Sequence, residues 1–176
     1  MDGSLLRDAY AHHVWASVRL IDACMALNPD QLEISPNGTY GSILDTVRHL
    51  VGSDRWYLLV LTEDGVPTID EDHMDLAELR AAMEADGGYW SDFLDRDLDP
   101  ARVIVRKRHD GSETHAPLGI RLAQAVHHGT DHRSQVCTAL TVLGIEPPAI
   151  DVWDFAESEG RLTEIEPTGE GPRNSG

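Results

Sequence analysis

The segment LGIRLAQAVHHGTDHRSQVCTALTVL, residues 118–143, predicts a long helix. With about 100° of rotation per residue, its apolar side chains gather on one side of that helix, as Ala125, Val136, Ala139 and Leu143. Gly144 and the Pro147–Pro148 pair then end the helical pattern. An apolar stripe of this kind is buried against other elements, so the segment predicts a fold built on packed helices.

Three further segments share this periodicity, and together the four predict an all-α four-helix bundle. They cover roughly residues 5–27, 42–62 and 75–96. Asp75, followed three residues later by Glu78, has the pattern of a capping box and predicts where the third helix begins. In such a bundle, functional sites form from side chains on facing helices.

Smaller elements are expected around the fourth helix. VIVRKRHDGSETHAP, residues 103–117, predicts a β-hairpin between the third and fourth helices, because two short runs flank an Asp-Gly turn. A short helical turn is expected near residues 152–158, with Trp153 packed on the bundle. The end of the chain is rich in Gly, Pro and charge, which is typical of disorder. We therefore predict one domain over residues 1–163 and a disordered tail over residues 164–176.

The net charge of the chain argues against some classes of binding partner. The 176 residues carry a formal net charge of -17, so phosphate backbones and anionic membrane surfaces should be repelled. VIVRKRH, residues 103–109, is the one basic cluster, and it is short. No apolar run is long enough for a transmembrane helix, and the N-terminus does not have the pattern of a signal peptide. With two cysteines and no disulfide framework, a cytoplasmic protein is expected.

Three histidines of the fourth helix are not equivalent. His128 and His132 lie four residues apart and so share one helix face, at the edge of the buried stripe. His127 points about 100° away from them. Two imidazoles at this spacing can bind a common metal ion, but they can equally be half-exposed histidines that are hydrogen-bonded to neighbouring acids.

A metal site needs a third ligand from another helix, and His49 is the main candidate. It lies in the middle of the second helix, although off that helix's main apolar stripe. It is therefore either peripheral or on a helix that is buried on two sides. A buried histidine without a metal is the competing interpretation, and His12 and His13 in the first helix are rival ligands.

Several motifs resemble the DinB-like family of bacterial four-helix metalloproteins. HHGTDHRSQV, residues 127–136, looks like the family's His-x-x-x-His-Arg-Gly-Gln segment on the last helix. Supporting motifs are YAHHVWASVRLIDA, YGSILDTVRHLVGSDRWYL and GIEPPAIDVWDFAE. The sequence departs from the family pattern at Asp131, where histidine is common, and at Ser134, where glycine is common.

The resemblance implies that His49, His128 and His132 bind one divalent metal, with zinc or nickel expected. It also implies a homodimer and no DNA chemistry. The superfamily includes enzymes that use the thiols bacillithiol or mycothiol, so one of these is a possible co-substrate for a small electrophilic substrate.

Three imidazole ligands leave a coordination position open, as catalytic sites do. An open position can bind water or hold a thiol as thiolate, and a thiol would have to come from a co-substrate because no cysteine stands at ligand spacing. Asp45, Asp131 and Gln135 are candidates to hydrogen-bond the ligand imidazoles. Arg133 is expected either to bind a substrate carboxylate or, preferably, to pair with a surface acid.

Three functions remain open at this point. The first is a metal-dependent S-transferase or isomerase that uses a low-molecular-weight thiol. The second is a hydrolase that uses metal-bound hydroxide, and the third is a non-catalytic, dimeric metal-binding stress protein. No side chain outside the metal site is identified as catalytic.

Overall fold

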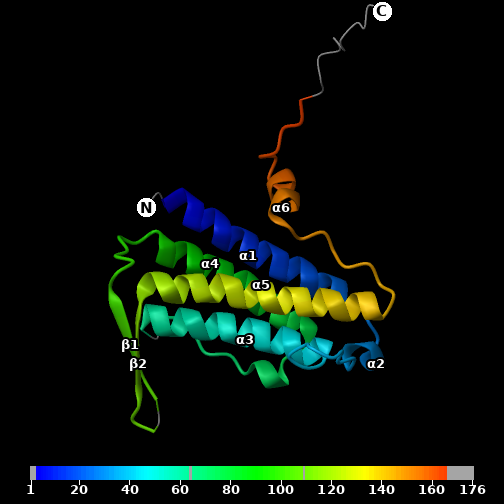
Figure 1. Cartoon of the computed structure of the whole chain (residues 1–176), viewed down its shortest axis with the longest axis horizontal. Helices are drawn as coiled ribbons and strands as arrows, with labels where there is room; N and C mark the ends of the chain where they lie inside the picture. The colour runs from blue at the N-terminus through cyan, green and yellow to red at the C-terminus, as the bar shows by residue number, and fades with distance from the viewer. Residues whose placement is uncertain (1–2, 64, 109, 166–176) are drawn as a thin grey trace, which may run out of the picture.

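Four long helices run side by side in a computed structural model that describes residues 3–63, 65–108 and 110–165 (Figure 1). They are α1 (Gly3–Cys24), α3 (Ile43–Thr62), α4 (Leu76–Leu94) and α5 (Leu118–Val142). Short helices lie between and after them, as α2 (Pro29–Leu32), the 3-10 helix η1 (Glu71–His73) and α6 (Val152–Ser158). The predicted four-helix bundle is confirmed, with boundaries within about three residues of those expected.

The loop between α3 and α4 determines the direction in which α4 runs relative to α3. α1 packs against α4 and α5, and α3 packs against the same two helices. Along the loop, Arg55 donates to the Pro67 carbonyl and Arg48, two turns earlier in α3, donates to the Met74 carbonyl. The loop thus returns along α3 before α4 begins, so α3 and α4 run in the same direction. α5 runs antiparallel to α3 beside it (Figure 1).

Side-chain caps explain where α3 and α4 begin. Ser42 accepts from the Asp45 backbone N–H, and Asp45 accepts in return from the Ser42 N–H. Asp75 and Glu78 form the same reciprocal capping box at the start of α4, as predicted. A capping box satisfies backbone donors that the helix itself leaves without partners.

The core consists of two apolar clusters at opposite ends of the bundle. One contains Leu20, Val47, Met83 and Leu140, and the other contains Tyr10, Leu58, Trp90 and Leu122. Between them, every long helix contributes buried polar side chains, which are His13 and Ser17, Asp54 and Arg55, Asp86, and Arg133. We call these six residues the polar layer. Burying charge is unfavourable without partners, so the layer depends on the contacts described below.

The hairpin is formed by β1 (Val103–Lys107) and β2 (Glu113–Pro117), which pair antiparallel as predicted. It lies at the end of the bundle where α3 ends and α5 begins (Figure 1). In the part of the chain that the structure describes, no helix combines the length and the apolar character that crossing a membrane requires.

α6 forms at the predicted residues, but the prediction that Trp153 packs on the bundle is wrong. Trp153 is 69% exposed, whereas Phe155 is 7% exposed and packs against the Trp15 ring at 5.5 Å between centroids. The two aromatic residues are two positions apart and so face different sides of one helical turn. The tail predicted for residues 164–176 lies outside the described residues from residue 166 onward.

Candidate metal centre

The imidazoles of His49, His128 and His132 converge between α3 and α5. The Nε2 atom of His128 lies 3.1 Å from that of His49 and 3.1 Å from that of His132. One ring nitrogen from each residue lies within 4.8 Å of the other two. Nitrogen atoms bound to one ion at about 2.0–2.1 Å with tetrahedral angles would be about 3.3 Å apart. Two of the three nitrogen–nitrogen distances are therefore close to that spacing, and the three histidines could hold a single divalent ion.

The cluster is buried on one side and accessible on the other. His132 is 8% exposed, whereas His49 and His128 are half-buried. Burial lowers the pKa of His128 to about 4, with added repulsion from His132 and then His49. Burial, followed by repulsion from His132, also lowers the pKa of His49. Both rings are therefore unprotonated at neutral pH, which is the form that binds metal.

The position of His49 off the main stripe of α3 has a structural explanation. α3 is buried on two sides, since it packs against both α4 and α5. The His49 ring faces α5 and is covered by Tyr40, whose ring stacks on it at 4.0 Å between centroids and an angle of 10°. Tyr40 also meets the edge of His132 at 5.4 Å. Tyr40 was not predicted as a site residue because it lies in a loop, where periodicity carries no information.

Gln135 connects this loop to the cluster. Its Oε1 atom accepts from the Tyr40 backbone N–H at 2.9 Å and lies 3.2 Å from the Nδ1 atom of His132. Because Oε1 is an acceptor, Nδ1 of His132 must carry the proton and donate it. Nε2 of His132 is then the nitrogen with a free lone pair, and it faces His128. Gln135 thus selects the tautomer of His132 that can bind a metal.

The other two predicted partners of the imidazoles are placed differently. Asp45 is exposed and hydrogen-bonds the Ser42 backbone as part of the α3 cap. Asp131 is also exposed, as is His127. Over the described residues, no hydrogen bond joins either carboxylate to His49, His128 or His132. Sequence proximity to a ligand did not bring these side chains to it.

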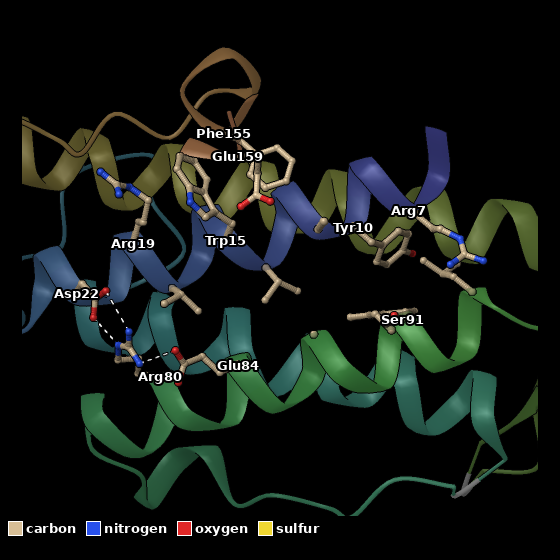
Figure 2. A pocket seen from close by; sticks show the side chains of 16 residues that line it. Arg7, Tyr10, Trp15, Arg19, Asp22, Arg80, Glu84, Ser91, Phe155 and Glu159 are labelled. Carbon is tan, nitrogen blue, oxygen red and sulfur yellow. Dashed lines mark hydrogen bonds and ion pairs between the residues drawn. The ribbon is translucent and has the colours of Figure 1, made fainter. Parts of the chain in front are cut away.

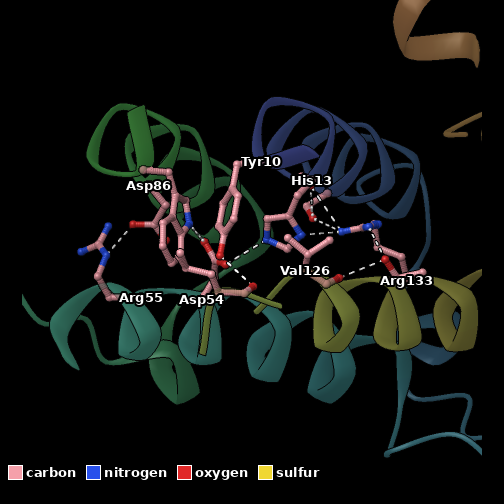
Figure 3. Close-up of polar contacts among 11 residues, drawn as sticks. Tyr10, His13, Asp54, Arg55, Asp86, Val126 and Arg133 are labelled. Atoms are coloured by element: carbon pink, nitrogen blue, oxygen red, sulfur yellow. Dashed lines mark hydrogen bonds and ion pairs between the residues drawn. The ribbon is translucent and has the colours of Figure 1, made fainter. Parts of the chain in front are cut away.

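Arg133 does not pair with a surface acid, and this prediction is wrong. It is 4% exposed and donates to Nδ1 of His13 at 3.0 Å and to Ser17 Oγ at 3.1 Å (Figure 3). On the far side of the His13 ring, Nε2 lies 2.9 Å from Asp54, which also accepts from the Trp90 indole at 2.8 Å. His13 is thus held within the polar layer and is not part of the histidine cluster.

The polar layer lies directly behind the candidate metal centre. Gly129, next to His128, has room for no side chain, because a Cβ atom there would lie 2.2 Å from Cε1 of His13. The absence of a Cβ lets α5 approach α1 closely enough for Arg133 to reach His13. Asp54 could have been suspected from sequence, since it is a carboxylate in the otherwise apolar stripe of α3.

Two cavities differ in their relation to the histidines. A cavity of about 480 Å³ is lined by His49, Tyr40, Arg48 and Glu71, and so opens on the cluster. A larger cavity of about 670 Å³ lies between α1 and α4 and contains none of the three histidines (Figure 2). Its Arg80 is already neutralised by Asp22 and Glu84. The histidine side of the bundle is therefore the candidate functional site.

Comparisons with known proteins agree with this fold. The model of the DinB family matches residues 1–169. A crystal structure at 1.70 Å resolution of a protein assigned to the DinB family, from Exiguobacterium sibiricum 255-15, superposes with a TM-score of 0.57. The two sequences are 20% identical, and the match covers 86% of this chain and 98% of that one, so this likeness shows the fold alone. No curated protein matches the sequence. Since the family model spans nearly the whole chain, the protein belongs to the DinB family.

Proposed function

We propose that the protein binds one divalent metal, zinc or nickel, through His49, His128 and His132, and that it is a thiol-dependent S-transferase or isomerase. The observation that carries this proposal is the convergence of three ring nitrogens from α3 and α5 beside a cavity. When bound, the metal would supply Lewis acidity that keeps a thiol deprotonated at neutral pH. With three protein ligands, a position for that thiol stays open.

The two cysteines of the chain are poorly suited to act as the nucleophile, which supports a thiol supplied by a co-substrate. Cys24 is fully buried, and burial raises its pKa to about 12. Burial also raises the pKa of Cys137. Neither belongs to the histidine cluster. A buried thiol with a raised pKa is a poor nucleophile, so a low-molecular-weight thiol such as bacillithiol or mycothiol is the proposed co-substrate.

The residues around the cluster have positioning roles in this proposal. Gln135 holds His132 in the tautomer that leaves Nε2 free, and Tyr40 covers His49. The polar layer anchors α5 from behind. A small electrophile would enter through the cavity beside His49, and the protein would act in the cytoplasm as a homodimer.

Metal content of the purified full chain tests the site. Wild-type protein is expected to carry close to one equivalent of metal, and His49→Ala and His128→Ala should each lose it. The matched control is His127→Ala, which removes an exposed neighbouring histidine and should keep the metal. Gln135→Leu should weaken metal affinity by roughly tenfold or more, whereas Asp131→Asn should leave it unchanged. Retention of metal by both ligand variants would refute the site.

Turnover of a model electrophile separates the candidate functions. The metal-loaded protein is tested on 1-chloro-2,4-dinitrobenzene with a series of cellular thiols, and on p-nitrophenyl acetate without any thiol. Thiol-dependent turnover that is lost in His128→Ala supports the transferase. Ester cleavage without thiol would instead indicate a hydrolase, and metal binding without either activity would indicate a non-catalytic metal protein.

A further inference from the structure

Three arginines converge on one groove of a strongly acidic protein. Arg106 and Arg108 come from the hairpin, and Arg121 comes from the first turn of α5. The groove has a volume of about 280 Å³ and is bounded on the α3 side by Trp56 and Tyr57. The chain has 31 acidic residues against 14 basic ones. Nevertheless, within the described residues no carboxylate forms an ion pair with any of these three guanidinium groups.

The register of the hairpin directs its positive charges. Arg106 pairs with Thr114 across the two strands, and both side chains are on the half-buried face that lines the groove. Lys107 is on the opposite, exposed face, where it pairs with Glu113 at 3.5 Å. Arg108, the residue directly after β1, also lines the groove. Of the three basic residues 106–108, Arg106 and Arg108 line the groove and Lys107 does not.

Arg121 is buried with only part of its guanidinium group hydrogen-bonded. It is 8% exposed, and its NH2 group donates to the carbonyls of Ile104 and Thr114. Its Nε–H has no hydrogen-bond partner among the described residues. Burial, followed by repulsion from Arg106, lowers the pKa of Arg121. An unpaired buried donor costs free energy, so Arg121 contributes a positive charge and an unused donor at the base of the groove.

Aromatic side chains position the groove and connect it to the histidines. The Arg106 guanidinium lies over the Trp56 ring, 4.2 Å from its centroid, which holds it extended across the groove. Tyr57 lines the groove and its ring also meets that of His128 at 5.8 Å between centroids. Gln124, another lining residue, is one helical turn before His128. The groove therefore adjoins the histidine cluster on the side of the hairpin.

We propose that this groove binds an anionic group, a carboxylate or a phosphate, of the small molecule that reacts at the histidine cluster. Guanidinium groups recognise both kinds of anion through charge-assisted hydrogen bonds. The volume suits one end of a small ligand, whose other end extends past Tyr57 toward His128. The link to the reaction rests on the proposed function, whereas the anion site itself does not.

Titration of the isotope-labelled full chain with succinate, inorganic phosphate and neutral succinamide tests the site. The arginine Nε–H signals of residues 106, 108 and 121 are followed by NMR. Succinate or phosphate, but not succinamide, is expected to shift these signals saturably, and the tighter of the two identifies the anion class. Arg106→Gln and Arg108→Gln should each weaken binding by about tenfold. Lys107→Gln, which removes the same charge from the other hairpin face, should change it less than twofold.

Two further measurements separate this proposal from the previous one. The anion should still bind to metal-free His128→Ala protein, so failure of the metal site would not be mistaken for failure of the groove. In cobalt-loaded wild-type protein, the paramagnetic ion should broaden the signals of the bound anion, and Arg106→Gln but not Lys107→Gln should abolish this. Equal binding of succinamide, equal weakening by Lys107→Gln, or no saturable shift would overturn the anion site. Saturable binding without broadening would overturn its link to the histidines.

Discussion

At the scale of single residues, the candidate site depends on which nitrogen of each imidazole is free. His132 shows this most clearly, because Gln135 fixes its Nδ1 atom as a donor and leaves Nε2 toward His128. His13 also carries an imidazole, but neither of its ring nitrogens is free to bind a metal. Its ring lies between Asp54 and Arg133, so both nitrogens already have partners. Two histidines of one protein thus differ as potential ligands because of their hydrogen-bond partners.

The lowered pKa of His128 predicts how the metal-free protein responds to acid. Its pKa of about 4 in the folded protein is below the ordinary histidine value of 6.5, so between these pH values the unfolded chain binds a proton that the folded protein does not. Stability should therefore be complete above about pH 6.5 and fall as the pH drops toward 4. We expect a loss of roughly 1–2 kcal/mol, because solvent screens this half-exposed group. Urea unfolding at several pH values with chelator present measures it.

His128→Asn removes this proton linkage and should flatten the dependence over the same pH range. His127→Asn is the matched control, because it changes an exposed histidine one residue away and should leave the dependence as in wild type. An unchanged slope in His128→Asn would contradict the assigned cause.

At the scale of elements, the site requires α5 to lie close to both of its neighbours. It faces α3 with His128 and His132, and it faces α1 with Gly129 and Arg133. The helical pattern of the sequence predicted the first of these contacts through the spacing of the histidines. The second was missed, since a glycine in a helix signals a close approach without indicating to which helix.

Gly129→Ala should therefore destabilise the fold although alanine favours helices. The added Cβ would lie 2.2 Å from the His13 ring, which is held on both sides and cannot move away freely. Overpacking of this kind costs about 1–3 kcal/mol, which exceeds the gain in helix propensity of about 1 kcal/mol. Chemical denaturation measures the change.

Gly88→Ala is the matched control for this substitution. Gly88 is also inside a long helix, but a Cβ atom there would meet nothing within 4 Å. It should stabilise the protein by up to about 1 kcal/mol. If both substitutions changed stability in the same direction, the close approach at Gly129 would not be the cause.

At the scale of the whole molecule, the stability of the fold is set by unfavourable charge terms and by the apolar surface buried in the two core clusters. With a net charge of -17, the excess carboxylates repel one another, and this repulsion destabilises the compact folded state. The buried polar layer adds to the cost of folding, because burial and then the neighbouring Asp54 raise the pKa of Asp86 to about 7 against the effect of Arg55. Two separate apolar clusters supply the compensating burial.

Salt should stabilise this protein, since ions screen the repulsion between its surface carboxylates. Raising the ionic strength from about 0.01 to 0.3 M, where the Debye length shortens severalfold, should raise Tm by about 2–4 °C, which corresponds to about 1 kcal/mol. Thermal melts with chelator present measure the shift. Sodium chloride and choline chloride should act alike, because ionic strength is responsible; a lower Tm in either salt would contradict the explanation.

Local pattern in the sequence was sufficient to predict the helices and the hairpin, and it placed His128 and His132 on one face of α5 without deciding whether they bind a metal. These features depend on periodicity, on caps and on turn residues that are close together in the chain. His49 was the main candidate for a third ligand because it lies in the middle of its helix, and the family resemblance implied the same residue, although its position off the main stripe of α3 argued against it. What only the tertiary structure decided is how polar groups far apart in the chain are paired: Asp54 and Arg133 with His13, and no described acid with Arg121. Asp54 and Arg133 lie 41 and 120 residues from His13 along the chain. Hydrogen bonds and ion pairs form only within a few ångströms, so the packing of helices decides them and the order of residues does not.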